Sequence, residues 1–246
     1  MKKRFFLIGF LALTSACNLP DSTPAAVSAP TQTPPAAPTT VSVAPSLGPT
    51  ETAVPTPEPP SLYFTEEFEV ESPYWEFFQT GGEQSPVTSF QNNTLQISIS
   101  SPDTWLIGIH NAHSYKNVFV RAKTTLNPIG SAGLICRYTE EEGWYEFNAA
   151  NDGNYSVLLG QWLSPGVVKY IPIVSDGSNS LRGNTTSEIG FFCEDDFLQL
   201  YVNDALLRRV DVTNYGLTEG KIGITASSFA NFPMTANFEW VSVSEK

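Results

Sequence analysis

A series of short β-rich runs in residues 61–246 constrains the fold more than any other feature of the chain. The runs are rich in β-branched and aromatic residues, are bounded by Gly, Pro, Asn and Asp, and recur at roughly 8–12-residue spacing. No stretch of this region keeps the 3.6-residue apolar period of an amphipathic helix. The pattern predicts one all-β domain, built as a two-sheet antiparallel sandwich. The expected strands, of which the first two are expected to pair with each other, are 63–68, 74–78, 95–100, 104–109, 117–126, 133–138, 144–150, 155–162, 167–173, 188–194, 197–203, 205–210, 221–227 and 236–243.

The segment GLICRYTEEEGWYEF, residues 133–147, is predicted to be two strands joined by a charged turn. Three consecutive glutamates, residues 140–142, occupy the turn, so their carboxylates are expected to splay apart and to be solvated. Residues 151–154 and 203–204 have the Asn, Asp and Gly composition of tight hairpin turns, because these residue types tolerate positive φ.

Apolar residues at alternate positions indicate which face of a strand meets the core. In the last expected strand Phe238 and Trp240 share one face, but Val241 and Val243 fall on the other. This slip predicts a bulge or the end of the strand near Val241.

Residues 1–16 have the features of a lipoprotein signal peptide. Three basic residues, 2–4, precede an apolar stretch, 5–13, that is too short for a stable membrane span. The sequence Thr-Ser-Ala-Cys that ends at Cys17 resembles a bacterial lipobox, which predicts cleavage before Cys17 and its diacylation. The alternative is an ordinary secretory peptide cut after Ala16, with Cys17 as a free thiol. The lipobox predicts an extracytoplasmic protein, lipid-anchored to the cell membrane of a bacterium.

Residues 17–60, the lipidated cysteine and the segment behind it, are predicted to be a disordered tether. Residues 18–60 hold 12 of the chain's 19 prolines and no Lys, Arg or aromatic residue. Such a composition cannot bury enough apolar surface to offset the entropy lost on ordering. In a polyproline II conformation, at about 3.1 Å per residue, this segment reaches at most roughly 130 Å.

Cys136 and Cys193 remain as a pair once Cys17 is assigned to lipid. In an oxidising compartment such a pair favours a disulfide, and we expect the two residues on neighbouring strands, Cys136 facing the same side as Leu134 and Tyr138. The alternative is two buried free thiols, which behave as small hydrophobic residues.

The formal net charge of −12, which becomes more negative when the basic signal peptide is removed, argues against nucleic acid as a partner. We expect a monomer without a cofactor. Two histidines, His110 and His113, and no Cys-x-x-Cys spacing argue against a transition-metal site, and both histidines are expected in surface or loop positions. Calcium is an alternative at the Asp- and Asn-containing segments 151–154 and 175–179, although turn propensity explains both.

The globular part resembles a known group of domains. The residues that carry the resemblance are ICRYTEEEGWYEF (135–147), a second cysteine strand, FLQLYVNDALL (197–207) and NFEWVSV (237–243). Together they resemble the concanavalin A-like lectin/glucanase jelly roll, in particular its 3-keto-disaccharide hydrolase and laminin-G-like members, over roughly residues 62–245. The resemblance implies a jelly-roll fold. It does not imply an activity, because such folds include lectins, glycanases and adhesion modules.

The carboxylate motif of the jelly-roll glucanases is missing. In those enzymes a Glu-x-Asp-x-x-Glu sequence on one strand sends the acids to the same face, and it does not occur here. Glu69 and Glu71 have i,i+2 spacing but stand near the start of the domain, and Glu146 has no acidic partner at i±2 or i±4 within its strand. A glycosidase needs two cooperating carboxyl groups. We therefore assign no catalytic residue.

Aromatic residues in the middle third of the domain are the better candidates for a site. Trp and Tyr rings stack on the C–H faces of sugars, while Arg and Asn bind the hydroxyl groups. The alternative is that these rings are packing residues of the sandwich core. The candidate carbohydrate-binding residues are Trp105, Arg137, Trp144, Tyr145, Tyr155 and Trp162.

The sequence thus predicts a membrane-tethered extracytoplasmic lipoprotein that displays a non-catalytic jelly-roll domain, which binds a glycan or another surface ligand. Two alternatives remain, a glycan hydrolase of the 3-keto-disaccharide type and a protein-binding adhesion module. Two carboxylates facing each other across a groove would favour the enzyme, and exposed aromatic rings without acids would favour binding.

Overall fold

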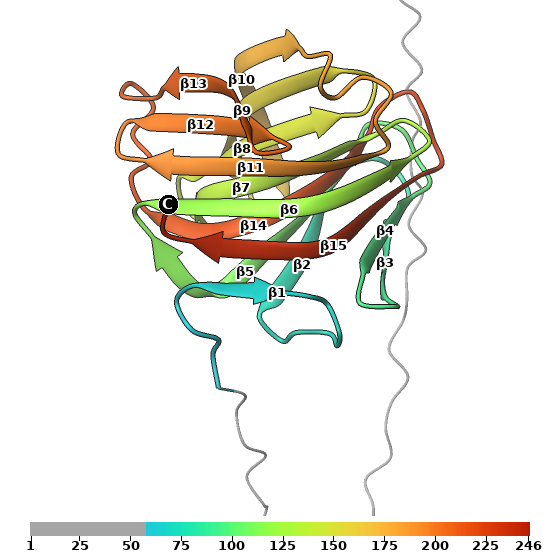
Figure 1. The fold of residues 1–246 in the computed structure, drawn as a ribbon, viewed down its shortest axis with the longest axis horizontal. Coiled ribbons are helices and arrows are strands. Elements are labelled where there is room, and N and C mark those ends of the chain that lie inside the picture. The colour runs from blue at the N-terminus through green and yellow to red at the C-terminus, as the bar shows by residue number, and fades with distance from the viewer. Residues whose placement is uncertain (1–57) are drawn as a thin grey trace, which may run out of the picture. The chain divides into compact units, whose positions relative to one another are not determined.

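Residues 58–246, which the computed structural model describes, form two antiparallel sheets that face each other (Figure 1). All regular structure in this range is β-strand, which confirms the predicted all-β sandwich. Within it there is no helix long and apolar enough to cross a membrane. The strands are β1 (Phe64–Glu66), β2 (Trp75–Gly81), β3 (Val87–Phe90), β4 (Leu95–Ile99), β5 (Thr104–Tyr115), β6 (Val118–Asn127), β7 (Ser131–Thr139), β8 (Gly143–Ala150), β9 (Asn154–Ser164), β10 (Val167–Gly177), β11 (Thr186–Glu194), β12 (Phe197–Val202), β13 (Ala205–Asp211), β14 (Gly220–Ser228) and β15 (Met234–Ser244).

The predicted signal peptide, the lipidated Cys17 and nearly all of the predicted tether lie outside the described residues.

One sheet has seven strands in the order β10-β9-β8-β7-β14-β5-β2. The other has eight, in the order β13-β12-β11-β6-β15-β4-β3, with β1 beside β15. The last two strands of the chain are internal to the two sheets: β14 lies between β7 and β5, and β15 lies between β6 and β4. The pairings in the centre of each sheet therefore join strands that are far apart in sequence, while β7–β10 and β11–β13 pair in chain order.

The core lies between the sheets and is filled by alternate residues of the strands. On β6, Val118, Val120 and Ala122 are buried while Phe119 and Arg121 on the other face are partly exposed. The period of two is the one that a strand with one face in a core requires. Removal of this apolar surface from water contributes about 25 cal/mol per Å² to stability.

Local irregularities change which face a side chain reaches. The register of β15 shifts between Phe238 and Trp240, so the slip predicted near Val241 is a bulge. Arg137 on β7 has φ +55° and lies within a second register shift, after which Tyr138 is on the outer face of the seven-stranded sheet. The expectation that Tyr138 shares a face with Cys136 is therefore wrong.

The edge strand β10 is also irregular. Its register with β9 shifts between Pro172 and Val174. Because proline has no backbone N–H, Pro172 removes one donor from this strand.

The first strands pair differently from the prediction. Strand β1 lies beside β15 and β2 lies beside β5, so the two belong to different sheets and do not pair. Strand β3, which was not predicted, pairs with β4 across a turn in which Asn92 and Asn93 both have positive φ. With only four residues, Val87–Phe90 is too short to give a clear strand signal in the sequence.

Cys136 and Cys193 form a disulfide, which confirms the predicted bond. The two residues are not on neighbouring strands, however, because Cys136 is on β7 of one sheet and Cys193 is on β11 of the other. Their Cα atoms are 6.6 Å apart, and both side chains are fully buried. The bond therefore links the two sheets across the buried core.

Removal of this disulfide is expected to destabilise the domain by up to about 4 kcal/mol, since it closes a loop with a sequence separation of 57 residues. The measurement is denaturant unfolding of the wild type and of the Cys136→Ala/Cys193→Ala double variant, each with and without reductant. Reductant should lower the free energy of unfolding of the wild type to that of the variant, and should leave the free energy of unfolding of the variant unchanged. A wild type that does not respond to complete reduction would contradict the prediction.

His110 is a core residue and not the surface or loop histidine that was expected. It lies on β5 with 1% of its surface exposed, among the rings of Phe64, Tyr74 and Trp75, whose centroids are 4.6, 5.9 and 5.0 Å away. Neither ring nitrogen has a hydrogen-bond partner. Burial, reinforced by the nearby His113, lowers the pKa of His110 to about 4.

This shift makes stability depend on pH in a defined window. Between about pH 6.5 and pH 4 the unfolded chain protonates His110 while the folded protein keeps it neutral, so stability falls as the pH is lowered. Over this window the His110 shift lowers the free energy of unfolding by at most about 3 kcal/mol. Unfolding of His110→Phe at pH 7, 5.5 and 4.5 should show a shallower loss than the wild type. His113→Gln should retain most of the wild-type slope, because burial is the larger cause of the His110 shift. Parallel pH profiles for His110→Phe and the wild type would contradict this.

Candidate functional site

The outer face of the seven-stranded sheet is strongly concave. Its two edge strands are β2 and β10, which would be about 29 Å apart in a flat sheet of this width. Yet the hydroxyl oxygens of Thr80 on β2 and Tyr170 on β10 are 3.0 Å apart and hydrogen-bonded. The sheet is therefore curled until side chains from its two edges meet over this face.

An aromatic cluster occupies much of the concave face. Tyr170 stacks on Trp105 with centroids 5.4 Å apart, and Trp162 lies 5.3 Å from Trp144. Gly160 makes room for Trp144, because a Cβ at this position would lie 2.5 Å from the indole. The cluster consists of Phe78, Trp105, Tyr138, Trp144, Trp162 and Tyr170.

A buried polar chain runs along β8 beside this cluster. Trp144 Nε1 donates to Glu146 Oε2 at 2.9 Å, and Asn148 Nδ2 donates to Glu146 Oε1 at 2.7 Å. The amide oxygen of Asn148 in turn accepts from Thr225 Oγ1 at 3.2 Å. Gly133 is required here, because a Cβ would lie 2.3 Å from Thr225 Oγ1 and 2.7 Å from the Asn148 oxygen.

Glu146 is fully buried within this chain. Desolvation raises the pKa of its carboxyl group, although hydrogen bonds from Trp144 and Asn148 oppose the shift. Its hydrogen-bonding side chains are an indole, an amide and the Thr225 hydroxyl, and none is a second carboxyl group.

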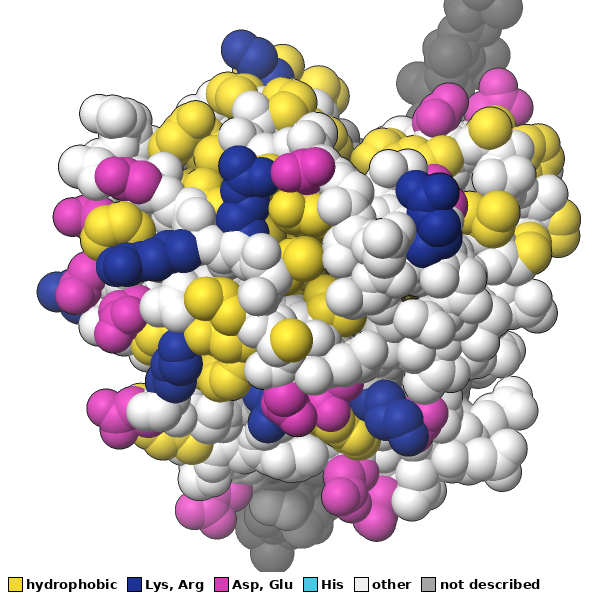
Figure 2. Space-filling view, turned by 45° about the horizontal axis from the view of Figure 1, so that its top comes forward, with side chains coloured by type: hydrophobic (Ala, Val, Ile, Leu, Met, Phe, Trp, Pro, Cys, Tyr) yellow, Lys and Arg dark blue, Asp and Glu magenta, His cyan; other side chains and the backbone are white. Residues whose placement is uncertain are grey.

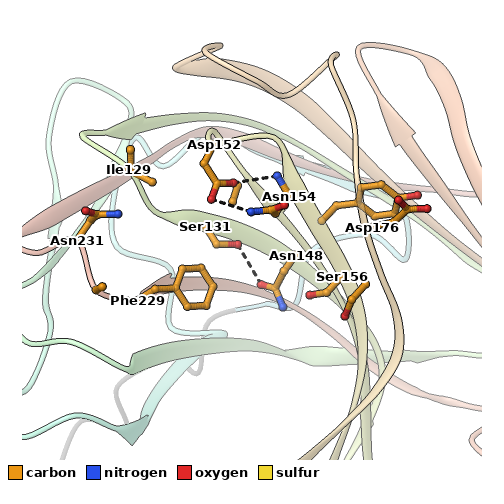
Figure 3. A pocket seen from close by; sticks show the side chains of 13 residues that line it. Ile129, Ser131, Asn148, Asp152, Asn154, Ser156, Asp176, Phe229 and Asn231 are labelled. Atoms are coloured by element: carbon orange, nitrogen blue, oxygen red, sulfur yellow. Dashed lines mark hydrogen bonds between the residues drawn. The ribbon is translucent and has the colours of Figure 1, made fainter.

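The open part of the concave face is a pocket of about 560 Å³ that begins where the polar chain ends (Figure 3). Asn148 is its innermost residue on β8, and Ser131 Oγ lies 3.5 Å from the Asn148 amide oxygen. Phe229, 41% exposed, projects into the pocket opposite these polar groups. The lining consists of Ile129, Ser131, Asn148, Ala150, Asp152, Asn154, Tyr155, Ser156, Ser175, Asp176, Phe229, Ala230 and Asn231.

Two carboxylates stand at the rim, each held by donors of the protein. Asp152 in the β8–β9 turn accepts from the backbone N–H and the side-chain amide of Asn154, both at 2.8 Å. Asp176 at the end of β10 accepts from Arg208 Nη1 at 2.8 Å and from the backbone N–H of Gly177. The lining itself contains hydroxyl, amide and carboxylate groups and no cationic side chain.

The six site residues predicted from the sequence have four different placements, of which that of Arg137 is described separately below. Trp105, Trp144 and Trp162 belong to the aromatic cluster, where Trp144 is fully buried. Tyr145 faces the core between the sheets and is also fully buried. Tyr155 is the one of the six that lines the pocket.

Arg137 has a structural environment at the end of the core. It is 1% exposed, and its guanidinium donates to the backbone oxygens of Leu217 at 2.8 Å, Asp195 at 2.6 Å and Lys116 at 3.3 Å. Neither Arg137 nor Tyr145 therefore has side-chain surface for a ligand.

The sequence reasoning missed most of the polar pocket residues. Asn148 was detectable, since it shares a face with Trp144 and Glu146 on one predicted strand. Ile129 and the segment 229–231 gave no signal, because they come from loops that the topology brings together.

No group of three or more His, Cys, Asp or Glu side chains that could hold a metal ion occurs within residues 58–246. Within the described residues, the segments 151–154 and 175–179, which were the calcium alternatives, are therefore not part of such a group.

Comparison with solved structures identifies the architecture. The domain superposes on a β-glucanase from Bacillus licheniformis with a TM-score of 0.51 and 15% identity, over 75% of this chain and 98% of that one. A β-1,3-1,4-glucanase (lichenase) derived from a mouse hindgut metagenome gives 0.52 and 12%, over 74% and 98%. A protein of unknown function with a galectin-like fold from Bacillus subtilis gives 0.53 and 12%, over 73% and 94%.

The fold is the concanavalin A-like jelly roll. The expectation from the sequence resemblance is thereby confirmed. No protein-family model and no curated protein matches the chain. At these identities the likeness concerns the fold alone.

The raised pKa of Glu146 has a measurable effect on stability. Above pH 4.5 the unfolded chain releases this proton while the folded protein retains it, so this group makes stability fall as the pH rises. From pH 5 to pH 8, Glu146→Gln should therefore lose less stability, or gain more, than the wild type. Glu142→Gln at the exposed tip of the same hairpin serves as the control and should follow the wild type. Equal pH slopes for Glu146→Gln and the wild type would contradict the prediction.

Proposed function

We propose that the domain is a non-catalytic carbohydrate-binding module, displayed outside a bacterial cell from a lipid-anchored tether. The pocket at the end of the concave sheet carries this proposal. It combines one exposed aromatic ring, Phe229, with amide and hydroxyl groups of Asn148, Ser131 and Ser156 on three adjacent strands.

The chemistry of the lining suits a sugar. The hydroxyl groups of a sugar both donate and accept hydrogen bonds, and amide, hydroxyl and carboxylate side chains provide the matching partners. The face of an aromatic ring covers the C–H side of the sugar, so the mixture of one ring and many small polar groups gives orientation as well as affinity. A volume of about 560 Å³ is in the range of small-ligand sites.

The arrangement of carboxyl groups favours binding over hydrolysis. Retaining glycosidases hold two carboxyl groups about 5 Å apart and inverting ones about 6.5–9.5 Å apart. Asp152 follows Glu146 by six residues, which is up to roughly 20 Å of extended strand. Asp176 is two strands away from β8 and opposite Tyr155, at the level of Ala149, so it lies on the order of 14 Å from Glu146.

The folds of the compared structures add support for a glycan ligand, since two of the three are glucanases by name. The face of the molecule that Figure 2 shows is also free of a dominant charge that would select another partner class. In Figure 2, exposed hydrophobic side chains alternate with scattered Lys or Arg and Asp or Glu, and neither sign prevails on the face shown.

The tether explains how such a module would be used. A diacylated Cys17 followed by a proline-rich segment of up to roughly 130 Å would hold the domain away from the membrane surface. Palmitate labelling of the full chain and of Cys17→Ala, followed by membrane fractionation, tests this part of the proposal. Label and membrane association should both depend on Cys17.

Binding is tested with a neutral glycan array and two pocket variants. Asn148→Ala and Phe229→Ala should each weaken the binding of any bound glycan at least tenfold, because one removes the central amide and the other the exposed ring. Phe232→Ala, an exposed aromatic residue just after the pocket-lining segment 229–231, and Asn237→Ala on the other sheet are the controls and should bind as the wild type.

The outcomes separate binding from hydrolysis and test where the glycan binds. If no glycan on the array binds, the proposal of a carbohydrate-binding module is wrong. Release of reducing sugar that disappears in Glu146→Gln would replace binding by hydrolysis. Binding that survives both pocket variants would place the glycan elsewhere on the domain.

A further inference from the structure

We infer that the pocket accepts the terminal unit of a neutral glycan and not an internal segment of the chain. The inference rests on the proposed carbohydrate binding and specifies which part of the polymer is bound. It follows from how the curled sheet closes its own concave face.

Along β8, the exposed part of the concave face stops at Asn148. Asn148 lines the pocket and is 5% exposed, whereas Glu146 and Trp144, the next outward-facing residues on the same strand, have no exposed surface. A glycan that entered along β8 would therefore have no further surface to follow beyond Asn148.

The obstruction consists of side chains from both edges of the sheet. The hydroxyl of Tyr170 is bonded to Thr80 on the opposite edge, and the ring of Tyr170 is stacked on Trp105. Desolvation raises the pKa of Tyr170, aided by the neighbouring Glu146, which agrees with a phenol held over the buried carboxyl group. The contact between the edges crosses the path that an internal segment would have to take.

The aromatic residue at the mouth belongs to the same barrier. Phe229 packs edge-on against Trp105, with their centroids 5.8 Å apart. One face of the pocket is therefore continuous with the closed region through Trp105, and the open side is the loop rim formed by residues 129, 152–154 and 229–231. A sugar that stacks on Phe229 enters from that rim and stops against Asn148.

The charge of the rim selects a neutral unit. Asp152 and Asp176 are the charged residues of the lining, and no Lys, Arg or His lines the pocket with them. Asp176 is paired with Arg208, but Asp152 has no cationic partner among the lining residues, so a uronate or sialate in the pocket would be repelled by the Asp152 carboxylate.

The experiment counts binding sites per glycan molecule. Neutral linear oligosaccharides that bind on the array are titrated by calorimetry as a series of four to twelve units, and the corresponding polysaccharide is titrated before and after partial cleavage by an endo-acting glycanase. We expect one protein bound per oligosaccharide molecule at every length. The amount of protein bound per gram of polysaccharide should rise in proportion to the number of new chain ends. Uronate-containing oligosaccharides, tested beside the neutral array, should remain unbound.

The inference would be overturned if the number of proteins bound per oligosaccharide grew with chain length. It would also be overturned if cleavage of the polysaccharide left the amount of bound protein unchanged. Carbohydrate binding would stand in both cases. Failure of every array member to bind would instead overturn the proposed function. Preferential binding of uronate-containing chains would overturn the assignment to neutral units.

A variant tests the barrier directly. Tyr170→Ala should open the concave face and raise the capacity for intact polysaccharide severalfold, while Tyr170→Phe, which keeps the ring, should stay at the wild-type level. A folded Tyr170→Ala with unchanged capacity would show that Tyr170 does not block the chain. If Tyr170→Ala does not fold, the wild-type stoichiometry decides the question by itself.

Discussion

The alternation of side chains along β8 is the constraint on which the rest of the structure depends. Tyr145, Phe147 and Ala149 fill the space between the sheets, while the residues between them build the concave face. Every residue of this strand is buried, so both faces of the strand are occupied by packing. A shift of one residue would exchange the two sets and place Glu146 in the apolar core, which is why its register is tightly specified.

Glu146 shows how function and stability are connected at this strand. A carboxyl group without water is costly, and here an indole and an amide provide its hydrogen bonds. The same amide, that of Asn148, forms the inner end of the pocket. The buried acid therefore acts as a positioning group: it fixes the orientation of the Asn148 side chain, whose other contacts reach Thr225 and Ser131.

The sequence was sufficient for the local structure and for the covalent link. Fourteen runs were predicted from β-rich composition and turn residues, and each corresponds to a strand, because alternation and turn chemistry are local properties. The Cys136–Cys193 bond followed from the number of cysteines and the compartment. Its placement between the sheets did not follow, because it depends on which distant strands pair.

The site was predicted less well, for a physical reason. Trp105, Trp144 and Trp162 were identified as candidates because aromatic residues are suited to sugars, but the curl of the sheet turns them into mutual packing partners. Curvature of this kind depends on contacts such as Thr80–Tyr170, which join residues 90 positions apart. Likewise Phe229 meets Ser131 and Asn148 only because β14 is inserted beside β7. Such juxtapositions are properties of the topology and are absent from any local pattern.

The irregularity of the edge strand β10 affects whether neighbouring copies of the domain can associate edge to edge. Sheet edges with regular rows of free backbone groups recruit strands from neighbouring molecules. Pro172 removes a donor from β10, and the register shift that follows it interrupts the regular row. With the lipid anchor that we propose, the domains would be confined to two dimensions and would meet one another far more often than molecules in free solution do. An edge that cannot template a new strand lets many copies stand side by side without joining into a common sheet.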